Sequence, residues 1–255
     1  GSIANWDTSK VTNMPHMFRG ATSFNQNVNH LNVSSLGDDW NCNHMFYGAS
    51  AFNNGEAPGE STSPLTFVGH EISGMRGFGY QSFYSASSFN QPLNFVCNKN
   101  DIWYYTFAGA TKFNQNINHL IQPSTNIERG HRYFANLLQS ATAFNNGGED
   151  LNIHIKEGTL DTLFSTSWNS NSPFYLCENL NVPVTMTIDA TKNGQNGLGN
   201  CFYGCTNFNK PVTLITPNTK ITGMNNMFYN ATSFNQPIGD WDVSNVTQMG
   251  SLVRN

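Results

Sequence analysis

A Phe-Asn pair recurs along the whole chain, and no other feature restricts the possible folds as strongly. The pairs begin at Phe24, Phe52, Phe89, Phe113, Phe144, Phe208 and Phe234, at intervals of 28, 37, 24, 31, 64 and 26 residues. The interval of 64 residues is about two periods, and we expect Phe164 and Phe174 to mark a degenerate repeat inside it. Repeats of roughly 20 to 50 residues are typical of solenoids. The sequence therefore predicts a repeat solenoid of about eight turns.

Apolar and small residues hold fixed positions relative to this pair. Six positions before it stand Phe18, Phe46, Phe83, Phe107, Leu138, Phe202 and Phe228, and three positions before it stand Ala21, Ala49, Ala86, Ala110, Ala141, Cys205 and Ala231. One repeat of this size cannot offset the conformational entropy lost on folding, so the repeats must stack to bury these positions. We expect residues 1–255 to form a single array that is cut in mid-repeat at both ends.

Two local patterns indicate the structure within each repeat. Alternation in the W-D-V and L-N-V segments predicts short parallel strands on one face, and the spacing of three and four in V-x-x-M-x-x-M-F predicts short helical or 3-10 segments on the other. Stretches rich in Gly, Pro and Ser predict loop insertions near residues 53–74, 165–173 and 191–199.

The asparagine of each pair is the most informative polar position. We expect its amide to bond backbone groups where the chain bends, so that equivalent asparagines of stacked repeats form a ladder. The predicted ladder residues are Asn25, Asn53, Asn90, Asn114, Asn145, Asn209 and Asn235.

Composition and motifs exclude several classes of protein. Charged residues make up 11% of the chain and the net charge is −4, whereas nucleic-acid-binding proteins carry a basic face. No apolar run approaches the roughly 20 residues of a membrane span. The sequence has no catalytic motif, no cofactor-binding motif and no metal-ligand spacing, and we expect a non-enzymatic protein. Cys42, Cys201 and Cys205 fall in apolar columns and are expected in the core, although pairing of Cys201 with Cys205 stays open.

The motif M-F-x-x-A-T-x-F-N-Q-x-I-x-x-W-D-V-S-x-V-T-x-M resembles the repeat of BspA-like leucine-rich-repeat surface proteins, which also occurs in mycoplasma surface lipoproteins and in protist and giant-virus proteins. Residues 3–34 and 221–249 carry it best, residues 83–120 and 202–217 carry it well, and residues 151–190 carry it poorly. The resemblance implies a leucine-rich-repeat-like, right-handed coil and adhesion to matrix proteins or other cells. It implies no catalytic residues.

These observations favour a surface recognition or adhesion module that binds an extracellular protein or glycan. Exposed candidates for the contacts are Asn32, Trp168, Tyr175 and Asp242. The alternative is a structural array that binds further copies of itself, as a coat, fibre or virion component. The first hypothesis places the protein outside the cell or on its surface, and the second places it in a virus particle or an extracellular filament.

Overall fold

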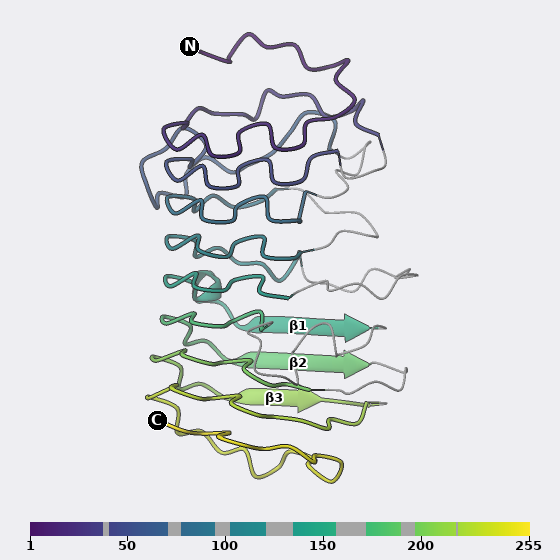
Figure 1. The fold of residues 1–255 in the computed structure, drawn as a ribbon, viewed down its shortest axis with the longest axis vertical. Coiled ribbons are helices and arrows are strands. Elements are labelled where there is room, and N and C mark those ends of the chain that lie inside the picture. The colour runs from purple at the N-terminus through teal and green to yellow at the C-terminus, as the bar shows by residue number, and fades with distance from the viewer. Residues whose placement is uncertain are drawn as a thin grey trace.

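The computed structural model describes residues 1–37, 41–70, 78–94, 103–120, 135–156, 172–189, 197–217 and 219–255. Its regular elements are a 3-10 helix η1 (Asn146–Gly148) and the strands β1 (Leu151–Lys156), β2 (Val184–Asp189) and β3 (Val212–Ile215). Figure 1 shows successive repeats lying one below another along the longest axis of the molecule, with the N-terminus at one end. Neighbouring repeats in sequence are therefore neighbours in space.

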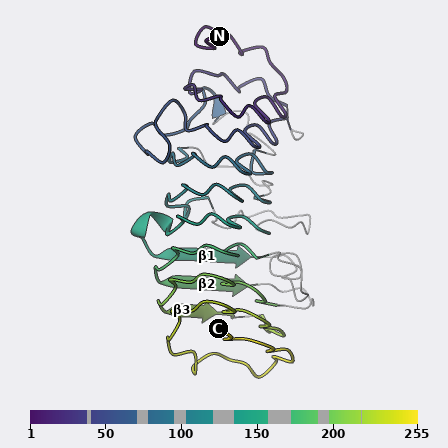
Figure 2. The same ribbon diagram turned by 60° about the vertical axis from the view of Figure 1, so that its left-hand side comes forward.

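The three strands form a parallel sheet in the order β1-β2-β3, which confirms the prediction of short parallel strands. Figure 2 shows them side by side on one face of the stack. Leu151 pairs with Val184, and Val184 pairs with Val212. Buried and half-buried residues alternate along β2, so Met186 points into the core while Thr187 points outward. Isolated parallel bridges between other repeats, such as Asn32 with Val68, continue the same pairing.

Stacked phenylalanine rings fill the interior. In most repeats the two phenylalanines lie face to face, and Phe46 and Phe52 have ring centroids 3.9 Å apart. Most rings also stack on their equivalents in the next repeat, as Phe46 does on Phe83 at 5.5 Å and Phe52 does on Phe89 at 5.9 Å. Rings buried in this way contribute both apolar area and the offset stacking that aromatic pairs prefer.

The aromatic stack changes column in the middle of the molecule. Leu138 occupies the first aromatic position of its repeat, and Leu180 occupies the second position of the following one. The stack therefore passes diagonally from Phe144 to Phe174, whose centroids are 6.5 Å apart, and continues from Phe174 to Phe202 at 5.8 Å. Phe174 thus belongs to the degenerate repeat, as expected, while Phe164 lies outside the described residues. Rings of neighbouring repeats stay in contact although leucine replaces phenylalanine at two positions, because Leu138 and Leu180 lie in different columns.

The segment before each Phe-Asn pair differs from the prediction. We call these residues the turn segments: 14–21, 42–49, 79–86, 103–110, 135–141, 172–177, 198–205, 224–231 and 249–254. The expectation of helical turns here is wrong, because positive φ angles recur every fourth residue, for example at His16 (58°) and Gly20 (69°). Left-handed residues interrupt a helix and leave a series of hydrogen-bonded turns. The apolar spacing of three and four is shared by both structures.

This conformation turns alternate backbone N–H groups toward the next repeat. The N–H groups of Met14, His16, Phe18 and Gly20 donate to the carbonyls of Asn41, Asn43, Met45 and Tyr47 at 2.5 to 2.9 Å. The same pattern joins later repeats, where Phe83 donates to Thr106 and Phe202 donates to Met227. The remaining N–H groups bond within the turn, as Arg19 does to His16. Each turn segment is therefore satisfied only when another lies beside it.

Removal of one stacked ring tests the role of the interior. Phe113 is fully buried and stacks on Phe107 at 4.0 Å, so Phe113→Ala is expected to lower the free energy of unfolding by about 3 to 5 kcal/mol. Thermal unfolding followed by circular dichroism would measure the change. The control is Trp6→Ala, because the Trp6 side chain is 48% exposed. Equal losses for the two variants would contradict a stability based on the ring stack.

Candidate functional site

The seven predicted ladder residues lie in one column. In each step the side-chain Oδ1 of one asparagine accepts the backbone N–H of the asparagine in the next repeat, as Asn25 does from Asn53 at 2.8 Å and Asn114 does from Asn145 at 2.7 Å. Sequence reasoning missed an eighth member, Asn181, which accepts from Asn209 and whose N–H donates to Asn145. Its signal is the pair Leu180-Asn181, in which leucine replaces phenylalanine.

The ladder also holds the first insertion. The Nδ2 groups of Asn25 and Asn90 donate to the carbonyls of Glu56 and Gly59 at 2.7 and 2.6 Å. Of the predicted insertion at 53–74, residues 53–70 are described, and its first part is thus bonded to repeats on both sides of its own. Most of the insertions at 165–173 and 191–199 lies outside the described residues.

The tetrapeptide F-N-N-G occurs at residues 52–55 and 144–147, and it adds a second acceptor to the ladder. The buried Oδ1 groups of Asn54 and Asn146 accept the N–H groups of Val28 and Ile117 at 3.0 and 2.9 Å. The following glycine has positive φ, and a Cβ on Gly147 would lie 3.3 Å from the backbone nitrogen of the preceding repeat. Glycine is required there because the two backbones approach closely.

A ladder variant tests this structural role. Asn114 Oδ1 accepts both the Asn145 N–H at 2.7 Å and the Gly147 N–H at 3.1 Å, so Asn114→Ala leaves two donors without their acceptor. We expect a loss of about 1 to 3 kcal/mol in the free energy of unfolding, measured in urea. Asn179→Ala is the matched control, since its Oδ1 accepts only an exposed side-chain amide from Asn207. An unchanged stability of Asn114→Ala would rule the role out.

Tyrosines project from the turn segments and stack on one another. Each directly follows a buried phenylalanine, in five Phe-Tyr dipeptides that end at Tyr47, Tyr84, Tyr175, Tyr203 and Tyr229. Tyr175 and Tyr229 stack on either side of Tyr203, with ring centroids 4.6 and 4.8 Å from it. The Arg254 guanidinium lies 5.9 Å from the Tyr229 ring centroid and continues the row. Sequence reasoning named only Tyr175 from this row, although the repeated dipeptide marks all five tyrosines.

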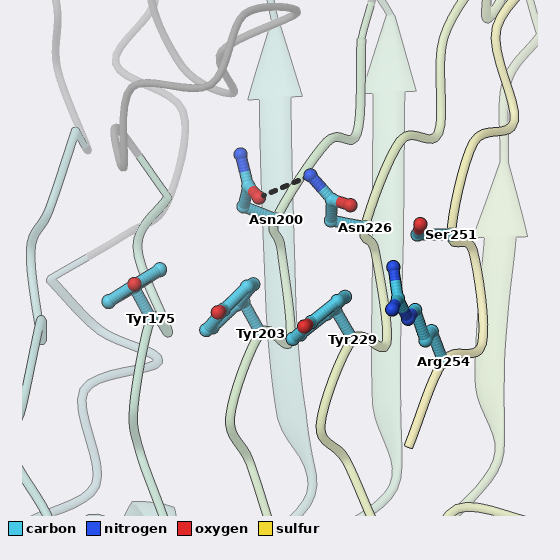
Figure 3. Close-up of a pocket in the computed structure, with 7 residues that line it drawn as sticks. All are labelled: Tyr175, Asn200, Tyr203, Asn226, Tyr229, Ser251 and Arg254. Atoms are coloured by element: carbon cyan, nitrogen blue, oxygen red, sulfur yellow. Dashed lines mark hydrogen bonds between the residues drawn. The ribbon is translucent and has the colours of Figure 1, made fainter.

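A row of amides runs parallel to the tyrosines, and a groove of about 290 Å³ lies between the two rows. Figure 3 shows Tyr175, Tyr203, Tyr229 and Arg254 in one row and Asn200, Asn226 and Ser251 in the other. Asn226 Nδ2 donates to Asn200 Oδ1 at 3.3 Å, which orders the second row. Burial and the neighbouring Tyr203 raise the pKa of the Tyr175 hydroxyl. The groove thus presents hydroxyls, amides and a single cation.

The same two rows have a different composition in the N-terminal repeats. Arg19 lies over the Tyr47 ring at 4.8 Å, and Tyr47 stacks on Tyr84 at 4.7 Å. Beside them His16 and His44 stack at 4.5 Å, and Tyr80 meets the His44 ring edge-on at 5.1 Å. Burial is the main cause that lowers the pKa of His44, and the charges of His16 and Arg19 lower it further, while Gln81 opposes the shift.

This pKa shift predicts a pH-dependent stability. Because the folded protein holds the pKa of His44 below its value in the unfolded chain, the unfolded state binds more protons in mild acid. The stability contributed by neutral His44 is present above about pH 6.5 and is lost as the pH falls through the folded pKa. Melting temperatures at about pH 7.5 and 5.5 should differ less for His44→Gln than for the unmodified protein. His154→Gln serves as the control, and a pH dependence unaltered by His44→Gln would contradict the assignment.

Two of the other predicted contact residues have local roles, and a third is not described. Asn32 Oδ1 accepts the Ser34 N–H at 2.9 Å, and Asp242 Oδ1 accepts the Ser244 N–H at 2.9 Å. The Ser244 hydrogen bonds lower the pKa of the Asp242 carboxyl. Both side chains therefore complete a turn of their own backbone. Trp168 lies outside the described residues.

The buried cysteines are free thiols. Cys42, Cys177, Cys201 and Cys205 are all fully buried. The thiols of Cys177 and Cys205 donate to the carbonyls of Leu138 and Phe174 at 3.2 Å, and burial raises the pKa of both. Among the residues that the structure describes, no group of three or more His, Cys, Asp or Glu side chains is placed to hold a metal ion.

Comparison with known proteins gives one match. The family model described as Mycoplasma protein of unknown function, DUF285, matches residues 1–63, 72–174 and 196–255. Neither the curated proteins nor the solved structures contain a match to the chain. The family model covers most of the sequence, including every described Phe-Asn pair, and the chain therefore belongs to the DUF285 family of repeat proteins.

Proposed function

We propose that the chain is a leucine-rich-repeat-like, right-handed solenoid whose turn segments recognise a protein or glycan partner at the cell surface. The observation that carries this proposal is the tyrosine row beside the amide row, with a groove of about 290 Å³ between them. The parallel strands and the ladder of backbone bonds between repeats support the solenoid. The resemblance to BspA-like repeats supports the location outside the cell.

The tyrosine row is not explained by the needs of the fold. The backbone of the turn segments is satisfied by bonds between repeats, and phenylalanines and asparagines fill the interior positions. Tyr203 and Tyr229 are only partly buried, yet they recur in register through the stack. Tyrosine and arginine are enriched where proteins bind partners, because a rigid ring gives large contact area at low entropic cost.

The chemistry of the groove favours binding over catalysis. Its lining consists of phenols, amides, the Ser251 hydroxyl and the Arg254 guanidinium. This set lacks a nucleophile paired with a general base, which covalent hydrolysis requires. A shallow surface that crosses several repeats suits a macromolecule better than a small substrate. No helix in the described part of the chain is both long and apolar enough to pass through a bilayer.

Binding to immobilised matrix proteins and glycans, measured by surface plasmon resonance, tests the proposal. We expect saturable binding that falls by at least about tenfold in Tyr203→Ser, because this change breaks the row between Tyr175 and Tyr229. The matched control is Thr213→Ala on the exposed side of β3. Equal effects of the two changes would contradict recognition through the turn segments.

The alternative function, a self-assembling coat or fibre, is tested with the same protein. Analytical ultracentrifugation should show a monomer under the conditions of the binding assay. Concentration-dependent growth of long particles, with no binding to any partner, would favour the structural array and overturn the recognition proposal.

A further inference from the structure

We propose that the groove between the tyrosine and amide rows binds an extended, acidic segment of a protein partner. This inference rests on the proposed recognition function and names the chemistry of the partner. It follows from the charge of the turn segments, from the shape of the groove and from the orientation of the tyrosine rings.

The turn segments have a charge opposite to that of the whole chain. The protein has 16 acidic and 12 basic side chains and a net charge of −4. Within the turn segments as described, however, every position lacks Asp and Glu, while Arg19, Arg254, His16 and His44 lie there. An acidic partner is attracted to this face, whereas the rest of the molecule repels it. Such complementarity determines the orientation and the rate of association.

The two arginines are held in place by the tyrosine rows. The Arg254 guanidinium lies 5.9 Å from the Tyr229 ring centroid, and the Arg19 guanidinium lies 4.8 Å from that of Tyr47. Stacking of this kind orients the guanidinium plane, and a guanidinium can bind a carboxylate in a bidentate manner. In Arg19 one of the nitrogens already lies 3.4 Å from His16 Nδ1. Arg254 is exposed and its turn segment contains no Asp or Glu, so a carboxylate from a partner can reach it.

The groove has the length and the polar groups that suit an extended peptide. Steps of 4.6, 4.8 and 5.9 Å lead from Tyr175 to Arg254, which corresponds to about four or five residues of extended chain at roughly 3.3 Å each. Across the groove, Asn200, Asn226 and Ser251 provide donors and acceptors on the other side of such a chain (Figure 3). Amides can serve the alternating N–H and C=O groups of a peptide backbone.

The orientation of the rings disfavours other polymers. Nucleic-acid bases bind proteins by stacking on open aromatic faces, and sugar rings pack on such faces too. In this row Tyr175 and Tyr229 cover the two faces of Tyr203, and Arg254 lies over the other face of Tyr229. Between Tyr175 and Arg254 the row therefore offers ring edges and hydroxyls to a partner.

Fluorescence anisotropy with a labelled peptide of alternating Glu and Gly tests the inference on the whole chain. We expect saturable binding that weakens as salt is added, and binding at least about tenfold weaker for Arg254→Glu. Asn226→Asp, which introduces a negative charge into the groove with almost no change in shape, should weaken binding as well. Lys210→Glu is the control, because it makes the same change of charge as Arg254→Glu at an exposed site outside the turn segments. Circular dichroism confirms that each variant is folded.

Three results would overturn the inference. They are equal binding of a Gln-Gly peptide, equal loss of binding in Lys210→Glu and Arg254→Glu, and stronger competition by polygalacturonate than by the acidic peptide. The assay of binding to matrix components distinguishes failure of this inference from failure of the proposed function. If Tyr203→Ser abolishes matrix binding while the acidic peptide does not bind, the recognition function stands and the acidic partner is wrong. If the unmodified chain binds no matrix component but binds the acidic peptide as predicted, the inference stands without the matrix adhesion role.

Discussion

Hydrogen bonds from one repeat to the next are the constraint on which the structure depends. The turn segments contain left-handed residues at two positions, which direct alternate N–H groups away from their own repeat. Such a segment cannot satisfy its backbone alone, and buried N–H groups without partners are costly. Stacking is therefore required by the backbone as well as by the phenylalanine core. The Asn ladder adds one side-chain bond in each repeat, in which the later repeat donates its N–H to the earlier one, opposite to the bonds between turn segments.

The need to satisfy the backbone and the need to pack the phenylalanine core divide the side chains into two classes. Phenylalanine, alanine and asparagine columns face the interior or the bends, and a change there acts on stability. The tyrosines of the Phe-Tyr pairs and Arg19 stand one position after a buried phenylalanine, on the outer side of the same turn segments. The rigid backbone holds them in straight rows at a regular spacing. The most recognisable motif thus builds the scaffold, and the less regular positions beside it form the surface.

Much of the fold could be predicted from the sequence, because the recurring Phe-Asn pairs show which positions of the repeats are equivalent. The Phe-Asn spacing placed Asn25 and the other ladder residues in one column, and alternation indicated the short parallel strands. The helical expectation failed because an apolar spacing of three and four also fits successive turns, and the left-handed positions are held by residues as different as His16 and Tyr105. Asn181 was missed because the residue before it is Leu180 and not a phenylalanine. The groove was missed because Ala108 and Gln139 interrupt the tyrosine row, so that the row does not form a constant column in the sequence.

The hydrogen bonds of the Asn ladder do not depend on the number of residues between successive ladder asparagines. Its successive bonds join residues 28, 37, 24, 31, 36, 28 and 26 positions apart, yet the seven distances all lie between 2.7 and 3.0 Å. Only the side chain of one asparagine and the N–H of the next are needed, and both are local to the bend. Repeats joined in this way can be lost or duplicated, or lengthened in one loop, while the bonds between the remaining repeats are kept. The exposed surface can therefore change by the exchange of intact repeats, without changes to the core.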